Sequence, residues 1–260
     1  MSRFSPPCLA GTGAVDGSEQ APAQTVEPAV RRMALNAAEL DAALSGGLLL
    51  AGLHEIHGPA ADAFALMLAL AAPRPGTILW VSDGKGRDGR LYGAGLAELG
   101  GDPSRLVLVI ADGSVSMLRA AHEALSCPAL ACVIIESHGA AAALDLTASR
   151  RLHLTADRAG VLALLVRREA EPAASAALSR WQALPAPSVP LPVMAPGPPR
   201  LVLTLLRQRG GPSGISAFME WNRDRKCLSA ASDQGGAAHP GTAPATAAQR
   251  TPRRTIRRAA

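Results

Sequence analysis

The hydrophobic positions between residues 34 and 228 fall into runs of two kinds that alternate along the chain. Runs such as 77–81 and 131–135 are short, almost continuously apolar and rich in Val, Ile and Leu. Runs such as 62–72 and 146–158 are longer and end close to Gly or Pro. Strands covered on both faces are continuously apolar, and they alternate with helices in a parallel sheet. The pattern therefore predicts an α/β fold with a mostly parallel sheet flanked by helices.

The predicted elements follow one another in strand–helix order up to residue 166. After a Pro-rich connection at 185–199, apolar runs at 200–206 and 215–221 flank the turn-forming segment 210–214. This arrangement is typical of a β-hairpin, which we place at an antiparallel edge of the same sheet. The earlier strands are expected at 53–57, 77–81, 105–110, 131–135 and 161–166, and the helices at 62–72, 90–99, 115–125 and 146–158.

The two ends of the chain differ from this central region in composition. Residues 1–33 are rich in Ala, Gly, Pro, Ser and Thr without periodicity, and residues 229–260 repeat that composition. Both are expected to be disordered tails, so the α/β core spans 34–228 and includes a C-terminal hairpin at 200–222.

The formal net charge of +5 lies mostly in the C-terminal tail, because five arginines there face one acid, Asp233. Such a tail can bind phosphate backbones weakly and without sequence preference. A solvated disordered end is the alternative interpretation, and both stay open. The five tail arginines are Arg250, Arg253, Arg254, Arg257 and Arg258.

Several classes of protein are set aside by composition. No run approaches the ~18 uncharged apolar residues of a membrane-spanning helix, and the N-terminus has no apolar signal segment. The four cysteines form no C-x-x-C pair, which favours reduced thiols in a cytoplasmic protein. His54 and His57 would face opposite sides of a strand, so no metal site is expected.

Residues 40–59 resemble the segment that leads into the phosphate loop of the RecA superfamily. In that family Gly-Pro continues as G-x-x-x-x-G-K-[ST], whose N–H groups, lysine and hydroxyl hold the phosphates and Mg²⁺. Here Gly58 and Pro59 are followed by Ala63, Phe64 and Ala65 at the positions of the second glycine, the lysine and the hydroxyl.

These replacements predict a degenerate phosphate loop. Ala63 makes a positive φ costly, Phe64 supplies no cation and Ala65 supplies no metal ligand. Asp62 adds a negative charge where a triphosphate would lie. We therefore expect no ATP hydrolysis by the usual route, no catalytic residue and no bound cofactor.

Two further positions resemble altered members of the same site. Glu136 ends an apolar strand where the superfamily places the acid that orients Mg²⁺, so it is either a vestigial metal position or a solvent-facing strand-end acid. In a gapless register, Lys85 falls where the superfamily has its water-activating Glu. A cation cannot orient an attacking water as a carboxylate does.

Two C-terminal segments narrow the resemblance to the ImuA family of bacterial inducible-mutagenesis proteins. Arg180-Trp181 matches its T-R-W segment, and the stretch from Arg207 to Gly214 matches its R-N-R-G-G-P-x-G segment, with Gln208 where Asn is usual. The likeness runs from about residue 33 to residue 221.

The resemblance implies a non-enzymatic accessory factor of mutagenic translesion DNA synthesis in the DNA-damage (SOS) response. Its expected partners are an ImuB-like relative of the Y-family polymerases and an error-prone replicative-type polymerase, with RecA as a third candidate. The arginines could instead be edge-strand charges that block sheet pairing. Candidate contact residues for partners or DNA are Arg180, Trp181, Arg207, Arg209, Gly210, Gly211 and the five tail arginines.

Other functions stay open at this point. A SulA-type inhibitor of cell division is also RecA-like without a phosphate loop, although such proteins are shorter and lack the Arg-x-Arg-Gly-Gly hairpin. An atypical DNA-binding RecA-like NTPase would bind Mg-ATP through an unconventional loop. A plain DNA-binding module would depend on the basic tail.

Overall fold

A computed structural model describes residues 31–86, 91–192 and 195–232 of the chain. The expected tails therefore lie outside the described residues over 1–30 and 233–260, and so do the five tail arginines. The expected start of the helix at residue 90 lies outside them as well.

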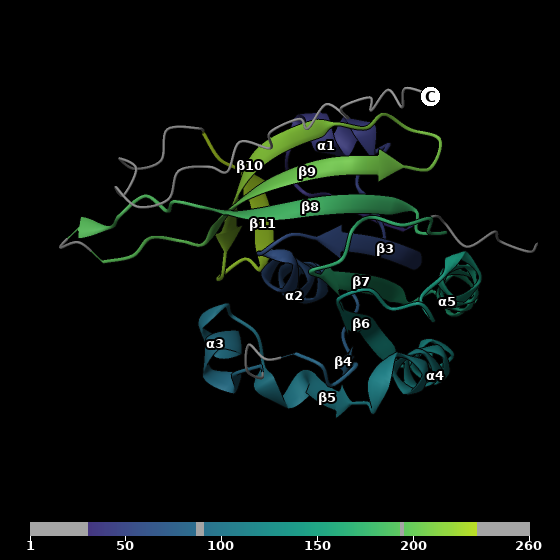
Figure 1. The fold of residues 1–260 in the computed structure, drawn as a ribbon. Helices are drawn as coiled ribbons and strands as arrows, with labels where there is room; N and C mark the ends of the chain where they lie inside the picture. The colour runs from purple at the N-terminus through teal and green to yellow at the C-terminus, as the bar shows by residue number, and fades with distance from the viewer. Residues whose placement is uncertain (1–30, 87–90, 193–194, 233–260) are drawn as a thin grey trace, which may run out of the picture. The chain divides into compact units, whose positions relative to one another are not determined.

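Among the described residues, one sheet of nine strands forms the centre of the fold (Figure 1). Its order is β11-β10-β9-β8-β3-β7-β6-β4-β5. The strands from β8 to β5 in this order are parallel, and β9, β10 and β11 continue the sheet in antiparallel fashion. The mostly parallel sheet predicted from the apolar runs is confirmed. The strands are β3 (Gly52–His57), β4 (Thr77–Ser82), β5 (Leu106–Ile110), β6 (Leu130–His138), β7 (Leu162–Arg168), β8 (Ser179–Ala186), β9 (Arg200–Gln208), β10 (Ile215–Asn222) and β11 (Cys227–Ala230).

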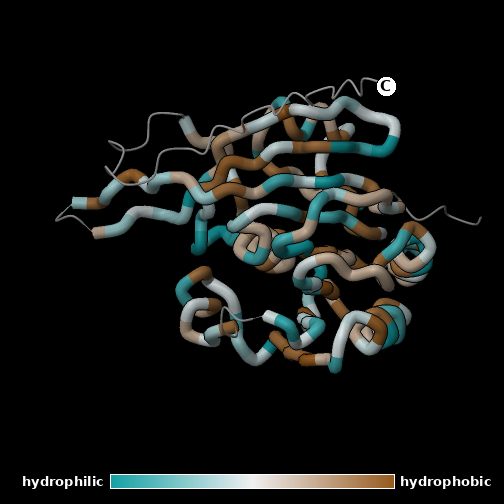
Figure 2. The backbone as a smooth tube through the Cα atoms, in the orientation of Figure 1, coloured by the Kyte–Doolittle hydropathy of each residue, from teal (hydrophilic) through white to brown (hydrophobic). Residues whose placement is uncertain are grey.

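Helices cover both faces of this sheet. On one face, α2 (Ala61–Ala71) contributes Phe64 to an apolar cluster that also contains Trp80 and Trp181. On the other face α4 (Gly113–Leu125) and α5 (Leu146–Ala159) pack over β3, β4, β6 and β7 in a second cluster. Figure 2 shows the hydrophobic colour concentrated on the sheet and on the inner sides of these helices. The smaller elements are α1 (Ala38–Ala43), α3 (Gly93–Glu98), a 3₁₀ turn (Pro103–Arg105) and the two-stranded pair β1 (Arg32–Met33) and β2 (Leu48–Leu49).

The structure differs from the sequence predictions at both boundaries of the core. β1 begins at Arg32 and β11 ends at Ala230, so ordered strands extend past residues 34 and 228. The predicted hairpin is present as β9 and β10, but β11 rather than the hairpin forms the edge of the sheet. No helix within 31–86, 91–192 and 195–232 is long and apolar enough to cross a membrane.

Candidate functional site

The segment that follows β3 is much shorter than a phosphate loop. Gly58 adopts φ +99, and α2 already begins at Ala61. Only Gly58, Pro59 and Ala60 therefore lie between the strand and the helix. A Cβ at Gly58 would collide with the carbonyl oxygen of Ala183 on β8, so this turn packs directly against the neighbouring strand.

The backbone donors of this turn are used inside the protein. Pro59 has no N–H group. The Ala60 N–H donates to the Ala183 oxygen at 3.1 Å, and the Ala61 N–H donates to the Gly58 oxygen at 3.1 Å. A phosphate cradle needs consecutive N–H groups that point at the anion. Three successive positions of this turn offer none.

The side chains at the former lysine and hydroxyl positions point into the core. Phe64 is fully buried, and its ring meets the ring of Trp181 edge-on at a centroid distance of 5.7 Å. Ala65 is fully buried as well, and Ala63 is half-buried. The residues of the turn do not fit a triphosphate or its Mg²⁺, because neither a cation nor a hydroxyl can reach them from α2.

A network of charged side chains lies at the carboxyl ends of β4, β6 and β7. Arg168 pairs with Asp62 at the start of α2, and one of its nitrogens lies 3.9 Å from Glu136. His138 lies between two carboxylates, 3.3 Å from Glu136 and 3.1 Å from Asp83. Burial raises the pKa of Asp62, and the nearby Arg168 opposes that rise.

Asp62, Glu136, His138 and Arg168 line a cavity of about 340 Å³. Its lining also includes the apolar or aromatic side chains of Trp80, Leu91, Tyr92, Leu108 and Ile110. Glu136 accepts a hydrogen bond of 2.8 Å from the indole N–H of Trp80, and its side chain is only 14% exposed. It is therefore not a solvent-facing acid, and internal partners hold its carboxylate. Within the described part of the chain, no group of His, Cys, Asp and Glu side chains is arranged to hold a metal ion. Lys85 is exposed and directly precedes Gly86, the last described residue of this loop.

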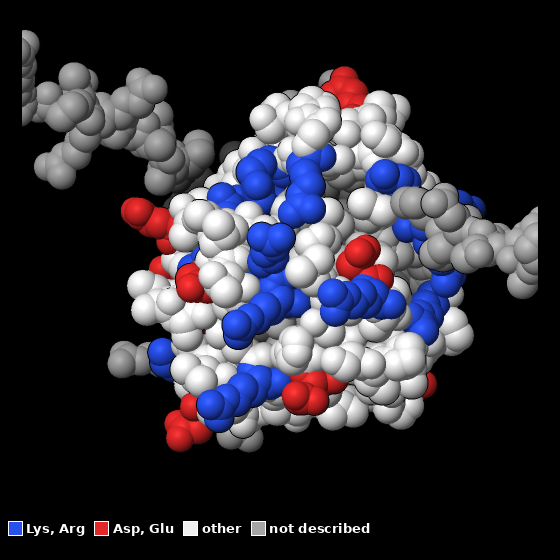
Figure 3. Space-filling model, turned by 90° about the vertical axis from the view of Figure 1, so that its right-hand side faces the viewer, with Lys and Arg blue, Asp and Glu red and all other residues white. Residues whose placement is uncertain are grey.

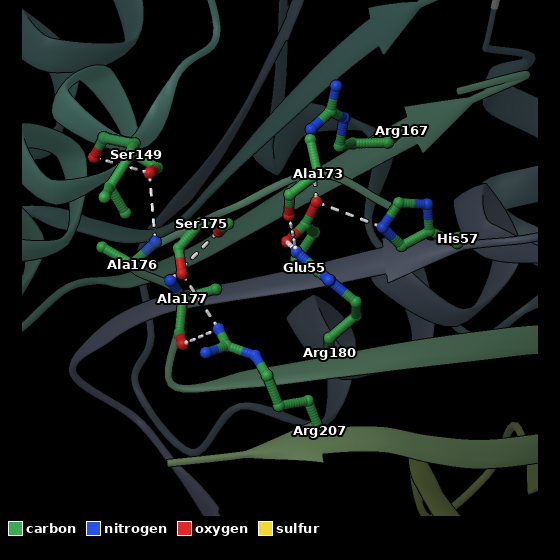
Figure 4. Close-up of polar contacts among 11 residues, drawn as sticks. Glu55, His57, Ser149, Arg167, Ala173, Ser175, Ala176, Ala177, Arg180 and Arg207 are labelled. Carbon is green, nitrogen blue, oxygen red and sulfur yellow. Dashed lines mark hydrogen bonds and ion pairs between the residues drawn. The ribbon is translucent and has the colours of Figure 1, made fainter. Parts of the chain in front are cut away.

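A second polar cluster lies on the face of the sheet that α5 covers. The Glu55 carboxylate is buried in β3 and accepts hydrogen bonds of 3.0 and 2.9 Å from Arg180 on β8 (Figure 4). The His57 Nε2–H donates to the Glu55 carboxylate at 3.1 Å, and a guanidinium nitrogen of Arg167 on β7 lies 3.5 Å from the same carboxylate. Burial alone would raise the pKa of Glu55, but the His57 hydrogen bond and the Arg180 charge lower it to about 2.

The arginines of the C-terminal segments also have internal partners. Arg207 donates to the carbonyl oxygens of Ser175 and Ala177 at 3.1 and 2.8 Å. Arg209 donates to the Ala176 oxygen at 3.0 Å, and Arg180 donates to the Ala173 oxygen. These bonds hold the connection between β7 and β8 against the sheet, as Figure 4 shows for Arg180 and Arg207.

Trp181 is fully buried, and its N–H donates to the Ser179 hydroxyl at 2.7 Å. Gly210 and Gly211 lie in the exposed turn between β9 and β10. The structure thus gives Arg180 and Trp181 internal roles. A partner contact through Arg207, Arg209, Gly210 or Gly211 stays a prediction.

The sequence prediction missed the charged residues of both polar clusters. Arg168, His138 and Glu55 were not identified as site residues. Their common signal is a charged or polar side chain inside or directly after a continuously apolar strand, as in His54–His57 and the Arg167-Arg168 pair. Such positions require internal partners, since an unpaired charge there would be costly.

The nine-stranded sheet and its covering helices define a RecA-like domain, in which Phe64 and Ala65 stand at the positions predicted for the lysine and hydroxyl of a phosphate loop. The crystal structure of the RadB recombinase aligns with a TM-score of 0.52 at 16% identity, over 74% of this chain and 96% of RadB. Protein ImuA from two strains of Caulobacter vibrioides is 35% identical over 190 residues, which cover 65% of this chain and 75% of ImuA. No family model matches the chain. The chain belongs to the ImuA family.

Proposed function

We propose that this protein is a non-catalytic accessory factor in DNA-damage-induced mutagenic translesion synthesis. Membership of the ImuA family supports the involvement in mutagenesis. The likeness to RadB supports the fold alone and says nothing of a recombinase activity.

The observation that carries the non-catalytic role is the state of the phosphate loop. Pro59 lacks a donor, the N–H groups of Ala60 and Ala61 are bonded internally, and Phe64 packs on Trp181. The charged groups that remain nearby are paired with one another. A domain with its sheet intact and its nucleotide ligands replaced can still act through its surface.

The proposed partners are an ImuB-like relative of the Y-family polymerases and an error-prone replicative-type polymerase, with RecA as a third. The proposal places the protein in the cytoplasm, where these polymerases act on DNA. It assigns the protein the role of an adaptor, whose effect depends on binding rather than on turnover.

Affinity purification of the full chain from cells with DNA damage tests this proposal. We expect the ImuB-like protein to co-purify, and we expect mutagenesis to fall when the gene is deleted. A variant such as Gly58→Val, which should disrupt the turn and the fold, serves as the negative control. The proposal would be overturned if no damage-tolerance polymerase co-purified with the protein and mutagenesis were unchanged in the deletion strain.

A further inference from the structure

Five arginines lie on one side of the described core, and we call this set the arginine column. They are Arg119 on α4, Arg150 and Arg151 on α5, and Arg207 and Arg209 at the end of β9. Four of them are exposed, and Arg207 is half-buried. Figure 3 faces the side on which Figure 1 shows α4, α5 and the end of β9. Blue side chains run down this face, with red ones beside them at several places.

Contacts between neighbouring elements show that the column is continuous. Arg209 donates to the Ala176 oxygen, and the Ala176 N–H donates to the Ser149 hydroxyl at 3.1 Å, directly before Arg150 on α5. Arg151 lies in the next position, and it lines a groove of about 430 Å³ together with Arg119. The end of β9, α5 and α4 are therefore neighbours, and Arg119 and Arg151 share one groove.

The column has few internal counter-charges. Within 31–86, 91–192 and 195–232, no carboxylate forms an ion pair with any of its five guanidinium groups. Glu123 and Asp145 line the same groove, but Asp145 already accepts the Ala148 N–H at 2.7 Å as the cap of α5. Arg207 and Arg209 donate to backbone carbonyl oxygens, which do not neutralise their charge. The positive charge of the column, most of it on the exposed Arg119, Arg150 and Arg151, is therefore available to an external polyanion.

The kind of polyanion follows from what surrounds the arginines. Proteins that bind single strands combine a basic surface with aromatic side chains on which bases stack. No Phe, Trp or Tyr occurs in the segments that carry these arginines or connect them, which are α4, α5, 175–178 and 207–209. A row of guanidinium groups without stacking partners suits phosphates, which arginine binds in bidentate fashion.

We propose that the arginine column binds the phosphate backbone of duplex DNA without sequence preference. The inference does not depend on the proposed adaptor role, because it uses only the charge, the exposure and the composition of this surface. It also places a DNA contact on the folded core, separate from the basic C-terminal tail.

The test measures fluorescence anisotropy of a labelled duplex with the full chain over a series of salt concentrations. The test variant is Arg119→Gln/Arg150→Gln/Arg151→Gln. The matched control is Arg223→Gln/Arg225→Gln/Lys226→Gln, which removes three exposed charges from the turn between β10 and β11, next to Gly100 beyond α3. All three proteins keep the tail, and thermal melting checks that both variants fold.

We expect the test variant to bind the duplex more weakly. The plot of the logarithm of its binding constant against log salt should become less steep by about two to three, since each lost phosphate contact reduces the steepness by about 0.9. The control should keep both values. Equal losses in both variants would overturn the proposal. So would tighter binding of a single strand of the same length, or equally effective competition by polyglutamate, which would indicate an acidic protein partner.

Discussion

Glu55 gathers three basic side chains in the middle of the sheet. Its buried carboxylate lies between Arg180, Arg167 and His57, and its pKa of about 2 keeps it ionised in the folded protein. A buried charge is tolerated only when it is paired, and removal of one partner leaves the others uncompensated. Glu55 is thus the residue that allows three basic groups to lie inside this layer.

Replacement of this carboxylate should destabilise the protein strongly. We expect Glu55→Gln to lower the free energy of unfolding by about 3–5 kcal/mol, because Arg180 and Arg167 lose their buried counter-charge. Urea unfolding measures the change. Asp224→Asn, which removes an exposed ion pair with Arg223, should have almost no effect. Similar midpoints for the two variants would contradict this account of Glu55.

His54 gives stability a defined dependence on pH. Its ring is buried between the Leu49 oxygen, at 2.8 Å, and the Ser179 hydroxyl, at 2.7 Å. Burial lowers the pKa of His54 to about 4 from its usual 6.5. Between pH 6.5 and pH 4, His54 takes up a proton in the unfolded chain but not in the folded one. The free energy of unfolding is therefore highest above pH 6.5 and falls as the pH is lowered towards 4.

The expected loss over that range is roughly 3 kcal/mol for this group alone. Urea unfolding of the parent protein and of His54→Gln, at several pH values, measures it. The variant should start less stable and show a much weaker dependence, with a remainder from His153, whose pKa burial also lowers. An unchanged slope in the variant would assign the dependence to other groups.

At the scale of elements, local sequence predicted some strands and not others. β4, β6 and β7 are continuously apolar, so their own residues specify buried strands. β8 contains Ser, Gln, Ala and Pro, and it is a strand because it pairs with β3 on one side and β9 on the other. The pairing of β8 with β3 joins segments more than 100 residues apart, and no local pattern encodes it.

The same limit applies to the candidate site. The loss of the lysine and the hydroxyl was evident from the residue types at 63–65. The early start of α2, the inward turn of Phe64 and the pairing of Arg168 with Asp62 depend on packing against β7 and β8. Those features required the structure.

The short edge strand β11 should contribute measurably to stability. Leu228 is 2% exposed, and its oxygen accepts a hydrogen bond of 2.8 Å from Asn36. A chain that ends at residue 232 should melt like the full chain. A chain that ends at residue 226 should lose about 2–4 kcal/mol, from the burial of one Leu and the lost hydrogen bonds. Equal melting temperatures for the two truncations would contradict this role.

Restoring the phosphate-loop residues should not restore the site. In Ala63→Gly/Phe64→Lys/Ala65→Thr, the new lysine replaces a ring buried against Trp181, and the N–H groups of Ala60 and Ala61 stay bonded. We expect a loss of about 3 kcal/mol or more and no binding of Mg-ATP by calorimetry. Phe64→Leu, as the control, should cost less. A restored variant that is stable and binds Mg-ATP would show that the turn can reopen.

At the scale of the whole molecule, the protein has the sheet and covering helices of a RecA-like domain, and the turn after β3 packs directly against β8. Charged side chains at the carboxyl ends of β4, β6 and β7 pair with one another and with Asp62 on α2. The protein belongs to the ImuA family, and the role we propose for it depends on binding to partners rather than on nucleotide turnover.

Calorimetric titration of the full chain with Mg-ATP, combined with an assay of phosphate release, tests this account most directly. We expect no saturable heat of binding and no phosphate release, with or without DNA. Saturable binding and turnover that disappear when Asp62 or Phe64 is replaced would show that the turn after β3 still holds a triphosphate, and would contradict the account.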